Sequence, residues 1–161
     1  MLTKFPLPLP RGISSGMKVP DDAVIGFNTF KSACEHGTRL LRGKLENSYD
    51  AYAAPHFSYH EATISYDFGR KSCRVLCSVF YPVIAFAAAG PPRDSCDLAF
   101  TDNEMLRTVI GEKLDGYVLS AEDANRGITQ ALIELLDEAE KKDVRYWNPR
   151  RVGDVIFNQW D

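Results

Sequence analysis

Histidine, tryptophan and cysteine are scarce in this sequence of 161 residues, which contains three, two and four of them. The four cysteines form no C-x-x-C pair. The phosphate-binding patterns G-x-x-x-x-G-K-[ST] and G-x-G-x-x-G are missing, and so is the G-x-S-x-G turn that exposes a nucleophilic serine. The sequence therefore names no reaction, and we predict that the protein uses no cofactor.

An excess of positive charge is also missing. The net charge is −3 and the isoelectric point is near 5.6, so the chain has no basic stripe and we expect no direct contact with nucleic acid. The densest basic group is Arg145, Arg150 and Arg151, diluted by Asp143 and Asp154. A solvated face is the favoured interpretation of this group, and a phosphate-binding cluster is the alternative.

No apolar run is long enough to span a membrane. The longest, residues 79–90, is short and is broken by Pro82. Prolines 6, 8 and 10 interrupt the apolar region that a signal peptide needs. We therefore expect a cytoplasmic protein whose four cysteines are free thiols.

The composition is that of a soluble globular protein, with 45% hydrophobic and 25% charged residues. A chain of this length fits one domain. Residues 1–21 are rich in proline and glycine without periodicity, which predicts an extended leader. Residues 22–161 are expected to form a single α+β domain.

Periodicity predicts one helix and then a group of strands. Apolar residues recur at helical spacing over residues 21–42, with Asp21 as a possible cap. Residues 56–68 and 73–81 have the pattern of strands joined by a turn at 69–72. Residues 83–89 form a third strand or continue the second.

Two helix starts follow the strands. Thr101–Glu104 has the form of a capping box, and Ser120–Asp123 repeats it with a shorter acid. The second start is followed by an apolar stripe that runs from Ala124 to Ala139 as one helix. This order of elements indicates an α+β fold, a small antiparallel sheet with several helices packed on one face.

Acidic residues gather where loops pass into these helices. If the junctions face the same way, they form an acidic patch that attracts a basic partner, and a plain solvated surface is the favoured alternative. The candidate partner-binding residues are Asp94, Asp97, Asp102, Glu104, Glu122 and Asp123.

His56, His60 and Glu61 suggest a metal site at first sight. Residues four apart on a strand are about 13 Å apart, too far to share one ion, so we predict no metal site. A small enzyme or ligand-binding module that uses the aromatic sheet face with His56, His60 and Glu61 is the second functional hypothesis.

The chain ends in RYWNPRRVGDVIFNQWD, which holds both tryptophans. Asn148 fits a helix N-cap with Pro149 at the first helical position. Trp147 and Val152 then have the spacing of a hydrophobic staple. We therefore expect a structural C-terminal helix with both tryptophans largely buried. Its apolar stripe comprises Val152, Val155, Ile156 and Trp160.

The same stretch resembles the C-terminal signature of bacterial immunity proteins of contact-dependent growth inhibition and related polymorphic toxin systems. The resemblance covers residues 145–161. It implies a cytoplasmic binding protein, not an enzyme, that neutralises a cognate toxin domain, often a nuclease, by occluding its active site. It indicates neither which toxin is bound nor the oligomeric state, and it gives no interface residues.

Overall fold

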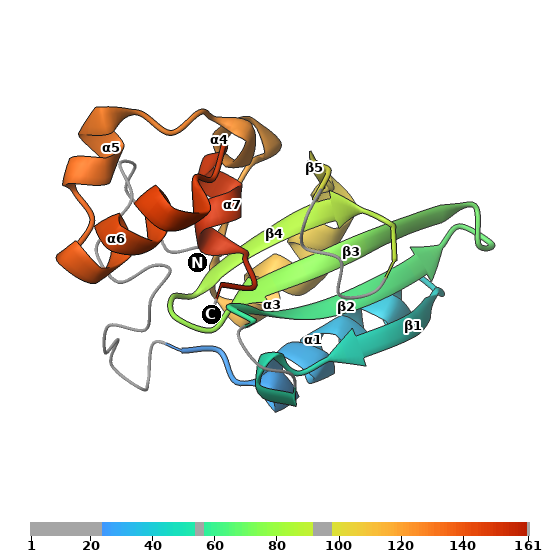
Figure 1. The fold of residues 1–161 in the computed structure, drawn as a ribbon. Coiled ribbons are helices and arrows are strands. Elements are labelled where there is room, and N and C mark those ends of the chain that lie inside the picture. The colour runs from blue at the N-terminus through green and yellow to red at the C-terminus, as the bar shows by residue number, and fades with distance from the viewer. Residues whose placement is uncertain (1–23, 54–56, 92–97, 161) are drawn as a thin grey trace.

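The computed structural model describes residues 24–53, 57–91 and 98–160, so the leader predicted for residues 1–21 lies outside it. Within these residues a six-stranded sheet has the order β1-β2-β3-β4-β5, and β6 pairs with β4 (Figure 1). The strands are β1 (Lys44–Tyr49), β2 (Tyr59–Tyr66), β3 (Lys71–Ser78), β4 (Val83–Ala88), β5 (Phe100–Thr101) and β6 (Tyr117–Val118). The predicted α+β fold is confirmed.

Neighbouring strands run antiparallel, except that β6 lies parallel to β4. The β2–β3 hairpin, in which Tyr59 pairs with Ser78, confirms the predicted short connection. Its turn contains Asp67, Phe68 and Gly69, all with positive φ. The segment at 83–88 is a separate third strand of the antiparallel series.

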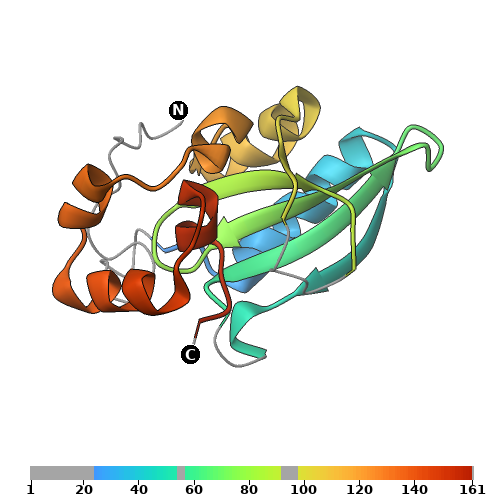
Figure 2. The same ribbon diagram turned by 45° about the horizontal axis from the view of Figure 1, so that its top comes forward.

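Helices cover both faces of the sheet, whereas the sequence predicted only one covered face (Figures 1 and 2). The helical elements are α1 (Phe27–Leu40), η2 (Ala51–Ala53), α2 (Glu104–Leu106), η3 (Arg107–Gly111), α3 (Glu112–Leu114), α4 (Ala121–Asn125), α5 (Gln130–Glu134), α6 (Glu138–Trp147) and α7 (Val152–Ile156). The segments α2, η3 and α3 follow one another without a break, and η3 is π-helical.

Two apolar cores lie on opposite faces because successive strand residues point to opposite sides. On one face, Ile64 and Val75 pack in a cluster with Phe30 of α1. On the other, Tyr59 belongs to a cluster with Phe157, next to α7. Both cores use residues of β2, so the central strands are buried on both sides. A single helical layer would leave one of these apolar faces in water.

The helix starts were predicted with mixed success. Ser120 caps α4 as expected, its hydroxyl accepting from the backbone N–H of Asp123 at 3.1 Å. The Thr101 capping box is wrong, because Thr101 pairs with Phe86 as part of β5. Asn103 is the N-cap instead, with its side chain accepting from the N–H of Leu106 at 3.0 Å.

The single helix expected after Ser120 is also wrong, since three short helices occupy its place. α4 ends at Asn125. Thr129 then caps α5, and Asp137 caps α6 through a 2.7 Å bond from the N–H of Glu140. A new helix begins at each of these two polar caps, which lie within the predicted apolar stripe. The helical period of the apolar residues alone does not reveal them.

Two further boundaries differ from prediction. α1 begins at Phe27 after Gly26, while the predicted cap Asp21 lies outside the described residues. The edge strand β1 was missed because it is largely polar and no residue in it is fully buried. Gly37 in the middle of α1 allows close packing, since a Cβ there would lie 2.7 Å from Ile110.

Candidate functional site

The C-terminal segment does not begin as predicted. α6 ends at Trp147, and Asn148 is its C-cap in the left-handed conformation (φ 48°, ψ 56°). The N–H of Asn148 donates to the carbonyl of Val144 at 2.9 Å. The prediction that Asn148 is an N-cap and Trp147 a staple is therefore wrong. Asparagine tolerates the left-handed conformation, and proline is common just after a helix end, so Asn-Pro here marks a stop.

Arg151 holds the next helix in place. Its guanidinium donates to both carboxylate oxygens of Asp154, at 3.1 and 2.7 Å, and to the carbonyl of Leu98 at 2.7 Å. It also lies over the ring of Phe100, with 4.8 Å to the centroid. These contacts tie α7 to the segment before β5. Arg151 therefore serves the fold, and it is not a free cation of a phosphate cluster.

The middle of the tail is core, as expected for Val152 and Ile156. Both are fully buried, and Phe157 beside them is 1% exposed. A side chain at Gly153 would collide with the ring of Phe100 and lie 3.0 Å from the carbonyl oxygen of Ala124. This close packing fixes α7 against β5 and α4.

The two tryptophans lie at the edge of this core. The prediction that they are largely buried is wrong for Trp147, whereas Trp160 packs against the core and is partly buried. Trp147 is 38% exposed. Their rings are parallel within 2°, with centroids 6.4 Å apart. Tyr146 beside them is 78% exposed. Because α6 stops at Trp147, the Trp147 indole stacks on the ring of Trp160 near the chain end and does not enter the sheet core.

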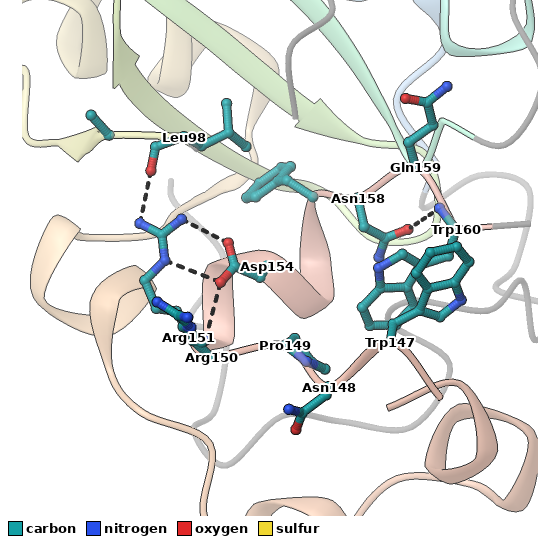
Figure 3. Close-up of a pocket in the computed structure, with 12 residues that line it drawn as sticks. Leu98, Trp147, Asn148, Pro149, Arg150, Arg151, Asp154, Asn158, Gln159 and Trp160 are labelled. Atoms are coloured by element: carbon teal, nitrogen blue, oxygen red, sulfur yellow. Dashed lines mark hydrogen bonds and ion pairs between the residues drawn. The ribbon is translucent and has the colours of Figure 1, made fainter. Parts of the chain in front are cut away.

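An open cavity of about 790 Å³ lies between this tail and the segment that leads into β5 (Figure 3). We call it the tail groove. Figure 3 shows Arg150 at one end and the tryptophan pair at the other, with Pro149 and Asn148 between them. Its lining residues are Leu98, Ala99, Trp147, Asn148, Pro149, Arg150, Arg151, Asp154, Phe157, Asn158, Gln159 and Trp160.

The charged residues of the tail groove differ in whether they are paired. Arg151 and Asp154 neutralise each other. Arg150 is exposed, and its side chain makes no hydrogen bond or ion pair within the described parts of the chain. Among the residues that the structure describes, the groove thus offers one available cation next to two indoles. Sequence reasoning missed it because a helix stop at Asn148 was needed to turn the aromatic residues outward.

The predicted acidic patch is only partly present. Asp94 and Asp97 lie outside the described residues. Asp102 accepts a hydrogen bond from the backbone N–H of Ala121 at 2.9 Å, which joins the start of α4 to the segment before α2. Glu122, the next residue of α4, is exposed. The two helix junctions therefore lie next to each other, with Asp102 and Glu122 both exposed.

Arginines neutralise two members of this acidic group. Arg107 binds the carboxylate of Glu104, and its hydrogen bonds hold the pKa of Glu104 below the ordinary value. Arg126 pairs with Asp123 at 2.9 Å. The remaining negative charge therefore comes mainly from Asp102 and Glu122, and we call these two residues the acidic junction.

His60 and Glu61 do not form a common site. His60 is buried, and its Nδ1 accepts from the N–H of Ala51 at 3.0 Å, so that nitrogen carries no proton. Its 3.5 Å contact with Asp50 is then not an ion pair. Glu61 points to the opposite face of β2, where Arg74 lies 3.6 Å away. His56 lies outside the described residues.

Within the described ranges, no three His, Cys, Asp or Glu side chains converge as metal ligands. No helix among the same residues is both long and apolar enough to cross a bilayer. Cys34, Cys73 and Cys77 are buried free thiols, as predicted. Cys96, for which the same state is predicted, lies outside the described residues.

Comparison with known proteins places the chain in no family. No protein-family model matches it, and neither a curated protein nor a solved structure matches it.

Proposed function

We propose that this protein is a cytoplasmic immunity protein that binds a cognate toxin domain of the nuclease class and blocks its active site. The resemblance of residues 145–161 to immunity proteins motivates the proposal. The observation that carries it is that the same segment places an exposed and a partly exposed tryptophan, stacked on each other, at one end of an open groove. The middle of the segment is core, but Trp147 near its start remains 38% exposed.

Tryptophan, tyrosine and arginine are the residues that dominate binding energy in protein interfaces. Tyr146, Trp147 and Arg150 are all exposed and follow one another closely along the chain. Ordered aromatic side chains on a helix end lose little conformational freedom on binding. The surface is therefore suited to a protein partner.

The acidic junction supports the same proposal in a second way. Asp102 and Glu122 project negative charge from a surface that two helix starts share. Enzymes that grip nucleic acid commonly carry basic surfaces, and complementary charge speeds the encounter of two proteins. The acidic junction would steer such a toxin toward the inhibitor.

The alternative, an enzyme or ligand-binding module built on His56, His60 and Glu61, stays a prediction. The geometry gives it little support, because His60 and Glu61 lie on opposite faces of the sheet. No observation on these residues favours a particular substrate.

A neutralisation assay tests the proposed function. The full chain is co-expressed with the toxin C-terminal region encoded beside its gene, and growth is compared with cells that carry an empty vector. We expect growth to be restored and the purified proteins to bind with a nanomolar dissociation constant. Cells that die despite stable expression of the full chain would contradict the proposal.

The role of the acidic junction in attracting the toxin is tested by a charge-reversal variant. Glu122→Lys should lower the association rate at low salt and leave the dissociation rate nearly unchanged. Glu134→Lys makes the same charge change at an exposed position of α5 and serves as the control. Equal association rates for the two variants would remove the acidic junction from the interface.

A further inference from the structure

The tail groove has two chemically different ends. Arg150 lies at one end and the tryptophan pair at the other, with Asn148 and Pro149 between them (Figure 3). We propose that the groove binds an extended segment of the partner protein that carries one acidic residue, with its carboxylate on Arg150 and an apolar side chain of the segment against Trp147 and Trp160. The inference rests on the proposed function in that the partner is a protein.

The cationic end calls for an anion. Arg150 has no charged partner within the described residues, whereas the neighbouring Arg151 is fully occupied by Asp154 and Leu98. A guanidinium binds a carboxylate through two parallel hydrogen bonds. Because only one cation of the groove is available, the ligand needs one well-placed negative charge and not a run of them.

The aromatic end calls for an apolar side chain. The parallel stack of Trp147 and Trp160 presents indole surface that is partly open to water. Covering it with an aromatic or aliphatic side chain removes apolar area from water on both partners. The exposed Tyr146 ring, 5.1 Å from that of Trp147, extends the same surface.

The part between the two ends fits a polypeptide backbone. Asn148 and Gln159 line the groove, and their side-chain amides, which bond no other described residue, can pair with peptide N–H and C=O groups. A nucleic acid is a poorer ligand, because the chain carries a net charge of −3 and the described lining of the groove offers a single free cation. An extended protein segment uses all three kinds of group together.

The charge of the tail groove is opposite to that of the acidic junction. Both surfaces adjoin α4. At the start of this helix, the backbone N–H of Ala121 donates to Asp102 of the acidic junction. Just after the end of the helix, Gly127 forms a β-bridge with Arg151, which lines the tail groove. A partner with a basic surface and one acidic segment would then dock in a single orientation. Charges of both signs fix the register of an interface in this way.

A peptide selection tests the inference. A random peptide library displayed on phage is selected on the full-length protein, and in parallel on Arg150→Glu, Trp147→Ala and the control Arg39→Glu. Arg39 is an exposed residue near the end of α1, outside the groove lining, and it undergoes the same charge change.

We expect wild type and Arg39→Glu to enrich peptides that combine Asp or Glu with an apolar residue. Arg150→Glu should switch the preference to Lys or Arg, and Trp147→Ala should lose the apolar preference. Purified acidic peptides should bind Arg150→Glu about ten- to a hundredfold more weakly, the range for a charged hydrogen bond. No enrichment, or the same preference in Arg150→Glu, overturns the inference.

The same variants in the neutralisation assay separate the two proposals. Unchanged peptide preference in Arg150→Glu together with normal protection from the toxin refutes the groove chemistry and leaves the immunity function standing. Failure of wild type to protect, with the expected peptide preferences intact, refutes the immunity function and leaves the groove chemistry standing.

Discussion

The tail divides into a buried half and a surface half, and this division makes a quantitative prediction about stability. Phe157 is 1% exposed, and its ring meets those of Tyr59 at 5.8 Å and Phe100 at 6.1 Å. Trp147, ten residues earlier by number, is 38% exposed and contacts mainly the neighbouring surface rings. Replacement by alanine should therefore affect the two residues very differently.

Removing a buried phenylalanine side chain costs about 3–5 kcal/mol, because its transfer energy is lost and a cavity remains. For Trp147→Ala the aromatic stack is worth about 0.5–1.5 kcal/mol beyond the area that it buries, and with the part of the indole that is covered the loss is about 1–3 kcal/mol. A domain of this size loses about 2–4 °C of Tm per kcal/mol. Phe157→Ala should thus lower Tm by about 6–20 °C and Trp147→Ala by about 2–12 °C.

Urea unfolding of the two variants, followed by far-ultraviolet circular dichroism, measures these differences without relying on tryptophan emission. Equal m-values show that the comparison concerns stability and not a change in the unfolded state. A loss for Trp147→Ala as large as that for Phe157→Ala would refute the reasoning. Trp147 would then be a core residue, and the tail would not be divided into a buried and an exposed part.

Three further predictions concern the described core. Arg151→Lys should lower the free energy of unfolding by about 1–3 kcal/mol, because lysine cannot reproduce the forked hydrogen bonds, and urea titration checks it. Gly153→Ala should destabilise by about 1–3 kcal/mol through its collision with a buried ring, while Gly127→Ala, with no atom within 4 Å of its new Cβ, should be neutral or slightly stabilising. Burial raises the pKa of the Cys73 thiol from 9.0 to about 11, which favours its protonated form in the folded state. The stability that this thiol contributes should be present below pH 9 and lost as the pH rises toward 11, so the unfolding free energies of wild type and Cys73→Ala should converge over that range.

The elements that could be predicted from the sequence are those whose local pattern fits only one kind of structure. The β2–β3 hairpin follows from alternating strands and a short turn, and Ser120 caps α4 as its sequence indicates. By contrast, Asn148 and Pro149 fit a helix start and a helix stop equally well. Tertiary packing decided for the stop, because Val152 and Ile156 are buried only if the chain turns before them.

The candidate site was harder to predict than the fold. Asp102 and Glu122 could be named from their places at helix starts, but their proximity depends on one hydrogen bond between segments nineteen residues apart. The tail groove depends on where α6 stops, and a helix start at Asn148 assigns its two tryptophans to the core. Amphipathic tryptophan satisfies a core pattern and an interface pattern alike, and only its exposed fraction distinguishes them.

Because the chain has only two tryptophans and both line the tail groove, one spectrum can test the central claim that this groove binds the toxin. The protein is produced with 5-fluorotryptophan and titrated with the unlabelled toxin domain encoded beside its gene, while fluorine resonances are recorded. The account predicts that both resonances shift and saturate at one equivalent of toxin. A complex that forms, as judged by its size, while both resonances stay unchanged would contradict it.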